Sequence, residues 1–211
     1  MMREDFHSYT PTEGHGLAHD PLNAIVGPRP IGWIGTKSNA GVLNLAPFSF
    51  FNLFNYRPPV LIFSGIGHKK DTINNVLETG EFTWNLVNRE LAEQMNLSCV
   101  AEPVDEFVFA NLTPLPGEVI GAPRVAESPV TMECKLLSCE QLKDIDGVVH
   151  PTWIAMGQVV RVHIARELID ENNTYQAQRV RRILRAGGPE DYYEITEDTL
   201  FRMPRPGSAS K

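Results

Sequence analysis

The stretch Ile31-Gly-Trp-Ile-Gly-Thr36, followed by Asn44-Leu-Ala-Pro-Phe48 and then Val60-Leu-Ile-Phe-Ser64, decides the architecture of this chain. Each apolar run is short and is bounded by glycine, proline or asparagine, the pattern of short strands joined by turns. The whole sequence contains sixteen glycines and sixteen prolines, which mark further turns along the chain. The sequence therefore predicts a mainly β fold, a barrel or sandwich with peripheral helices.

Later segments extend the strand pattern. Further strands are expected at residues 81–87, 131–137 and 154–164. Two of them alternate clearly, with Met132, Cys134 and Leu136 on one face of the first. In the second, Val160, Val162 and Ile164 interleave with Arg161 and His163. Each is expected to turn its apolar set inward and its polar set to water.

Three helices are expected. The first begins with Asp71 or Thr72 as N-cap and ends at Gly80, and the second covers residues 89–97 after Asn88. The third covers residues 175–186 and carries four arginines, Arg179, Arg181, Arg182 and Arg185. We interpret them as a solvated face, with Arg185 as the exception beside a Gly-Gly turn. Binding of a nucleotide phosphate or an acidic partner is the alternative.

Composition narrows the class of protein. The 211 residues fit one domain, with a folded core at about 20–205 and flexible tails at 1–16 and 204–211. A net charge of −7 disfavours nucleic acid and anionic membranes as partners. Neither a secretory signal nor an apolar run long enough to span a bilayer is visible. A cytoplasmic protein is expected.

The commoner catalytic signatures are missing from the sequence. No dinucleotide-binding turn, phosphate-binding P-loop, nucleophile elbow or metalloprotease helix is present. His15 and His19 have a helical metal spacing but no further ligands, so we expect surface histidines and no metal site. Three cysteines without regular spacing predict no disulfide, and Cys134 is expected as a small buried hydrophobe.

The chemistry between Pro28 and Thr72 fits a flavin phosphate, which needs an anion site, polar partners and flat apolar walls. Lys69 and Lys70 precede a predicted helix N-terminus, where backbone N–H groups favour an anion and Thr72 adds a hydroxyl. The alternative is that Asp71 or Thr72 only caps the helix while the lysines stay solvated.

Residues 44–52 offer Ser49 and aromatic surface to a flavin ring, with a core strand and turn as the alternative. Trp33 could line the ring pocket or fill the core.

These motifs resemble the flavin reductase-like family, which includes flavoredoxin-type proteins. The resemblance rests on Pro28-Arg-Pro-Ile-Gly-Trp33, on the segment Asn44-Leu-Ala-Pro-Phe-Ser-Phe-Phe-Asn52 and on Lys70-Asp-Thr-Ile-Asn-Asn75. It continues through Gly80-Glu-Phe-Thr-Trp-Asn-Leu-Val-Asn88 to Arg185-Ala-Gly-Gly188 with Tyr192. The sequence departs from the family at Trp33 and Trp84, where a smaller residue is common, and in the loop His150-Pro-Thr-Trp153.

The resemblance implies an FMN-binding split β-barrel and a homodimer with the flavin near the interface. It implies FMN contacts from Thr36, Asn44, Ala46, Pro47, Ser49, Phe50, Phe51, Asn52, Lys70, Asp71 and Thr72.

The implied activity is that of an NAD(P)H-dependent flavin reductase, in which hydride passes from the nicotinamide to flavin N5 and no catalytic side chain is needed. The alternative is a flavoredoxin-type carrier that exchanges electrons with protein partners. The sequence leaves three things open: NADH against NADPH, the electron acceptor, and whether FMN is a prosthetic group or a substrate.

Overall fold

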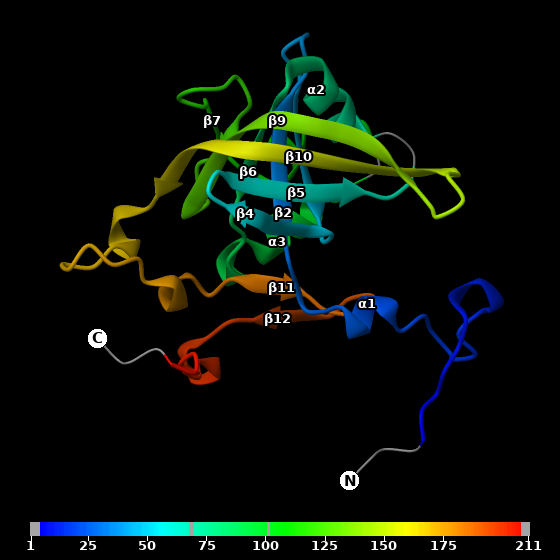
Figure 1. The fold of residues 1–211 in the computed structure, drawn as a ribbon. Coiled ribbons are helices and arrows are strands. Elements are labelled where there is room, and N and C mark those ends of the chain that lie inside the picture. Colours follow the sequence, from blue (N-terminus) through cyan, green and yellow to red (C-terminus); the bar gives the residue numbers. More distant parts are fainter. Residues whose placement is uncertain (1–4, 68–69, 101, 208–211) are drawn as a thin grey trace.

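The body of the protein is a strongly curved antiparallel sheet (Figure 1). The structure is a computed structural model that describes residues 5–67, 70–100 and 102–207. Within these residues the large sheet has seven strands in the order β3-β2-β6-β9-β10-β5-β4. In chain order they are Gly32–Lys37 (β2), Leu43–Phe48 (β3), Phe51–Tyr56 (β4), Pro59–Gly65 (β5), Glu81–Asn85 (β6), Val130–Lys143 (β9) and Val149–Ile164 (β10).

Smaller elements surround this sheet. A second sheet has the order β1-β11-β12, and β7 pairs with β8. These short strands are Arg29–Pro30 (β1), Pro114–Leu115 (β7), Arg124–Val125 (β8), Ile183–Arg185 (β11) and Tyr192–Glu194 (β12). The α-helices are Leu22–Ile25 (α1), Asp71–Thr79 (α2), Ala92–Leu97 (α3) and Glu106–Phe109 (α4). Short 3-10 helices are Pro11–Glu13, Arg89–Leu91, Arg166–Leu168, Ala177–Val180 and Glu197–Thr199.

The sheet curls back on itself where β3 meets β4. These strands stand at opposite ends of the strand order, yet only Ser49 and Phe50 separate them along the chain. The ring of Phe48 lies 4.9 Å from that of Phe63 on β5, so β3 packs against the strand beside β4. A mainly β protein with peripheral helices is confirmed.

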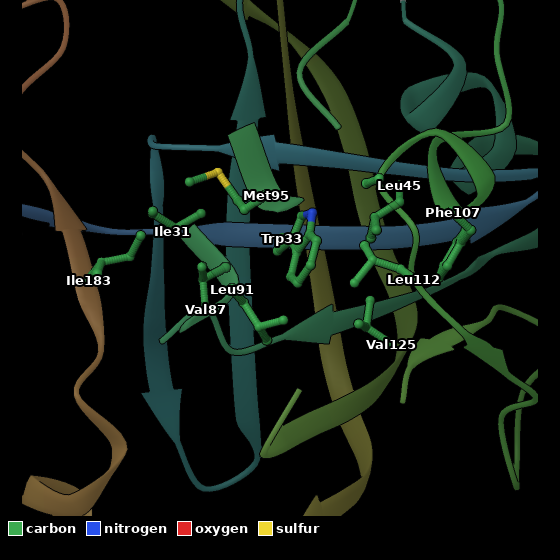
Figure 2. Close-up of a cluster of buried hydrophobic side chains, with 11 residues drawn as sticks. Ile31, Trp33, Leu45, Val87, Leu91, Met95, Phe107, Leu112, Val125 and Ile183 are labelled. Carbon is green, nitrogen blue, oxygen red and sulfur yellow. The ribbon is translucent and has the colours of Figure 1, made fainter. Parts of the chain in front are cut away.

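Trp33 belongs to the core. Its side chain is fully buried among apolar residues of β3, α3 and α4 (Figure 2), and its Nε1 donates a hydrogen bond of 2.9 Å to Ser98 Oγ. A second apolar cluster fills the space between the sheet and α2, where Cys134 is fully buried as predicted. The core interpretation of Trp33 therefore holds.

The apolar face of β9, with Met132, Cys134 and Leu136, packs in the core as predicted, but its polar face and the predicted inward face of β10 need correction. Val160, Val162 and Ile164 are exposed by 38–46%, whereas Glu133, placed on the wet face, is fully buried. The β9–β10 register shifts between Val159 and Arg161, so Val160 is the extra residue of a bulge in β10. Glu133 is buried because a neighbouring loop supplies its hydrogen-bond donors.

The third predicted helix is wrong. Its residues form a single 3-10 turn, Ala177–Val180, followed by β11, and Arg181 between them has φ of +51°. Val180 and Ile183 are buried, so the apolar spacing that suggested a helix instead serves a turn and a strand. Arg181 is exposed but forms ion pairs with Glu90 and Glu194, which fixes it in place.

The first two helices are confirmed with shifted starts. Helix α2 has Lys70 as its N-cap residue, without a side-chain cap, and ends at Gly80 in the left-handed region. The second is a 3-10 turn that runs into α3, and Asn88 Oδ1 caps it by accepting from Leu91 N. Among the described residues, the longest apolar helix falls short of the length needed to cross a membrane.

Candidate functional site

The β3–β4 connection borders an open groove of about 780 Å³. Phe50, Phe51 and Asn52 line it, together with Ser64 of β5 and Ile154 of β10. The opposite wall comes from the segment before β2, whose lining residues are Ile25, Val26, Gly27, Pro28, Arg29 and Pro30. Apolar walls with a few polar groups are typical of cofactor sites.

Aromatic packing fixes the floor of this groove. The ring of Phe51 stacks on Trp84 at 5.7 Å with an interplanar angle of 7°. Trp84 in turn donates from Nε1 to the Ile31 carbonyl at 2.9 Å. Phe51 is therefore a mostly buried support, whereas Phe50, 41% exposed, presents its ring to the groove.

Arg29 brings a positive charge to the groove wall. Its Nη1 donates to the carbonyls of Asn23 and Val26, and its guanidinium carbon lies 5.2 Å from the centre of the Phe50 ring. Its Nε is buried and has no hydrogen-bond partner among the described residues. Because this atom is buried, a ligand in the groove does not reach it, and Arg29 contributes the positive charge of its guanidinium to the wall.

A polar cluster joins β2, β3 and the first turn of α2. Asn44 Nδ2 donates to Thr72 Oγ1 at 2.9 Å and to Thr36 Oγ1 at 3.4 Å, and Asn75 Nδ2 donates to Thr36 Oγ1 at 3.0 Å. All four side chains are buried. The structure thus brings together three predicted site residues and adds Asn75, which the motif contained but the sequence argument did not single out.

The start of α2, where the sequence predicts an anion site, begins at an exposed lysine; the anion site itself stays a prediction. Lys70 is exposed at the N-cap position, and the first backbone N–H groups of α2 have no side-chain cap. Asp71 is exposed in the first turn, and its negative charge also favours the helix N-terminus. Lys69 lies outside the described residues.

The edge strand β3 is held by a helix. Glu106 of α4 accepts from Leu45 N at 3.2 Å, and burial raises the pKa of this carboxyl. This contact was not predicted, because α4 contributes only four residues and has no strong sequence signature.

The remaining predicted residues lie along β3 and just beyond it. Ala46 pairs with Ile34 and packs against the second apolar cluster, so its side chain contacts the core. Pro47 and Ser49 line a smaller pocket of about 140 Å³, separate from the large groove. The predicted residues therefore occupy neighbouring positions rather than one pocket: the groove, the smaller pocket and the start of α2.

Known proteins agree with this architecture. The sequence model of the flavin reductase like domain matches residues 27–184. An uncharacterized protein of Aquifex aeolicus is 38% identical over 183 residues, covering 84% of this chain and 89% of its own.

Two solved structures are similar over most of both chains. Nitrilotriacetate monooxygenase component B from Bacillus cereus superposes with a TM-score of 0.79 at 28% identity, covering 96% of this chain and 98% of that one. A Shewanella frigidimarina protein with a split barrel domain has a TM-score of 0.75 at 27% identity, covering 87% and 89%. The fold is therefore the predicted split barrel, and the chain belongs to the flavin reductase-like family.

Proposed function

We propose that this protein binds FMN and acts as an NAD(P)H-dependent flavin reductase. The observation that carries the proposal is the open apolar groove with Phe50 and Asn52 on one wall and the guanidinium of Arg29, stacked over the Phe50 ring, on another. Family membership supports a flavin-related oxidoreductase function.

The groove and the start of α2 offer the two ends of an elongated site. Ser64 lines the groove near the end of β5, and α2 begins seven residues later at Asp71. A flat ring system in the groove would leave a phosphate group to reach Lys70 and the free N–H groups of α2. The cluster of Thr36, Asn44 and Thr72 would form a rigid floor beneath the phosphate end. Asp71 would contribute through its backbone N–H, because its carboxylate repels a phosphate.

FMN would supply the redox chemistry by accepting hydride at N5 from the nicotinamide. The chain's own residues would exclude water and orient the ring, with Phe50 and Ile154 as apolar walls. Ser49 and Phe50 lie outside the β2–β3 and β4–β5 registers, so their N–H groups take no part in these strand pairings. Within the segment 46–49 we assign the stabilisation of negative charge that develops on the ring to the backbone N–H of Ser49, since residues 46–48 pair with β2 and Pro47 has no N–H.

A homodimer with the flavin near the interface is part of the proposal. Leu53, Phe54 and Tyr56 on β4 are 49–72% exposed, beside a groove that is open on one side. A second copy would cover these apolar side chains and shield the groove from water.

FMN and riboflavin together test the two ends of the site, because riboflavin lacks the phosphate. Binding is measured by the quenching of flavin fluorescence on titration with protein. We expect Lys70→Ala to weaken FMN binding about 10-fold or more and to leave riboflavin binding unchanged. Asn52→Ala should weaken both, and Lys143→Ala, in the exposed end of β9, should change neither. Absence of binding by the wild type, or an equal effect of Lys70→Ala on both flavins, would contradict the proposed site.

The reaction is tested by anaerobic mixing of the FMN-loaded protein with NADH or NADPH. A reductase loses its visible flavin absorption with at least one of the two. Reduction only by dithionite or by a protein donor would instead support the flavoredoxin-type carrier.

A further inference from the structure

Glu106 lies beside the proposed phosphate end of the flavin site. Its Oε2 accepts a hydrogen bond of 3.2 Å from Leu45 N. The preceding residue of β3, Asn44, donates from Nδ2 to Thr72 Oγ1 at 2.9 Å, in the first turn of α2. Consecutive residues of β3 therefore contact the Glu106 carboxylate and the start of α2. This carboxylate is thereby placed close to the backbone N–H groups that are proposed to bind a phosphate.

The first turn of α4 holds Glu106 in this position. Asp105 Oδ1 caps the helix by accepting from Phe107 N at 3.0 Å and from Val108 N at 3.3 Å. Phe107 is buried in the same apolar cluster as Leu45 (Figure 2). Because the residues on both sides of Glu106 are fixed, its half-buried side chain stays at the edge of β3.

The carboxylates near Glu106 give it a negatively charged surrounding. Burial raises the pKa of Glu106 and the carboxylates of Asp105 and Asp71 raise it further, whereas hydrogen bonds from backbone N–H groups lower it. Among the described residues, no lysine, arginine or histidine forms an ion pair with any of these three acids. Lys70 is exposed at the N-cap of α2. A further negative charge at this place would favour protonated Glu106 still more.

We propose that binding of a flavin phosphate at the start of α2 is coupled to the uptake of one proton from solvent by Glu106. A phosphate monoester carries about −1.5 to −2 charges at neutral pH, so ionised Glu106 opposes its binding and protonated Glu106 does not. Glu106 is therefore a specificity residue, which lowers the affinity for FMN and leaves that for riboflavin unchanged. The inference rests on the proposed function, because it names the regulation of the same site.

The pH dependence of this coupling has a definite sign. A bound phosphate raises the pKa of Glu106 further, so the contribution of Glu106 to FMN affinity falls as the pH rises through its titration. The phosphate of FMN loses its own second proton near pH 6, and the dianion binds the helix N-terminus more strongly, which is an opposing effect. Comparing the wild type with Glu106→Gln at each pH cancels this contribution of the ligand.

The test therefore compares Glu106→Gln with the wild type in the full-length protein. Glutamine keeps an acceptor for Leu45 N and removes the charge. FMN and riboflavin are titrated by fluorescence quenching at pH 5, 6.5 and 8, and a melting curve is recorded for every variant. The matched control is Glu78→Gln, exposed in the last turn of α2 and about 10 Å along the helix from Asp71. Glu106→Ala removes the acceptor as well as the charge.

The proposal expects Glu106→Gln to bind FMN about 5-fold more tightly than the wild type at pH 8, with a gain of less than 2-fold at pH 5. Riboflavin binding, and both flavins with Glu78→Gln, should change less than 2-fold throughout. Glu106→Ala should raise the ratio of FMN to riboflavin affinity in the same way, because the lost Leu45 contact affects both flavins. Isothermal titration in two buffers of different ionisation enthalpy should show fewer protons taken up by Glu106→Gln.

Three results would overturn this inference and leave the proposed function standing, provided that the wild type binds FMN. They are no tighter FMN binding by Glu106→Gln at pH 8, a gain that does not change with pH, and an equal gain for riboflavin. Absence of FMN binding by the wild type would overturn the function itself.

Discussion

Glu133 offers the clearest test of how this fold holds a loop with a buried charge. Its carboxylate is fully buried on β9 and accepts from the backbone N–H groups of Glu118, Val119 and Ile120 at 2.8, 2.9 and 3.1 Å. It also lies 2.7 Å from His163 Nε2. These hydrogen bonds outweigh the cost of burial, and the pKa of Glu133 is lowered.

Replacement by glutamine keeps the shape and removes the charge. One carboxylate oxygen faces Glu118 N and His163, and the other faces Val119 N and Ile120 N, so the new amide NH₂ must point at donors on one side. At about 1–3 kcal/mol for each donor left without an acceptor, Glu133→Gln should lower the free energy of unfolding by about 2–5 kcal/mol.

The assay is urea unfolding of wild type and variant at several pH values, with Glu140→Gln on the exposed part of β9 as control. Because the folded-state pKa of Glu133 is lowered, its stabilisation is complete above the unfolded value of 4.5 and is lost as pH falls through the folded value. The difference between wild type and Glu133→Gln should therefore be largest near neutral pH and shrink in acid. A difference within 0.5 kcal/mol of zero at pH 7, or one that does not change with pH, would refute this reasoning.

Three further outcomes follow from packing. Gly157→Ala should destabilise the protein by about 3 kcal/mol or more in urea unfolding, because the new Cβ would lie 2.3 Å from the buried Phe82 ring; a change below 1 kcal/mol would contradict it. Trp33→Phe should cost about 1–3 kcal/mol, since it removes the buried indole hydrogen bond to Ser98 Oγ, which keeps its own bond to the Met95 carbonyl, and leaves a cavity in the core. Cys99 is exposed, whereas burial raises the pKa of Cys134, so Ellman's reagent should label the first rapidly and the second only in denaturant.

The strands that carry strong local signals could be predicted from the sequence, and the pairing between distant segments could not. Residues 60–64 and 44–48 are short apolar runs with turn residues at both ends, and they form β5 and β3 with a shift of one residue. Strand β4 was missed. Its last four residues, 53–56, follow a segment that looks like a turn in the sequence, and they form a strand because they pair with β5.

The sequence predicted which residue types form the candidate site, but it did not predict which of these residues lie together in space. Thr36, Asn44 and Thr72 meet because β2 pairs with β3 and α2 packs on both, a contact set by tertiary structure. Arg29 belongs to the motif Pro28-Arg-Pro-Ile-Gly-Trp33 but was not singled out, since its place on the groove wall over the Phe50 ring is set by tertiary structure.

Two errors in the sequence analysis concern charged side chains that each hold a loop. Glu133 was placed in water and Arg185 on a helix, yet each is an ionised side chain that binds three backbone groups of one loop. Hydrophobic periodicity assigns charged residues to the surface, because it cannot register donors or acceptors that arrive from a distant loop. Such loops contain too few apolar residues to pack a core of their own, so an internal charge is an efficient way to order them. In the loop held by Arg185, that order gives Tyr192 a fixed position in a pocket that Ser49 also lines.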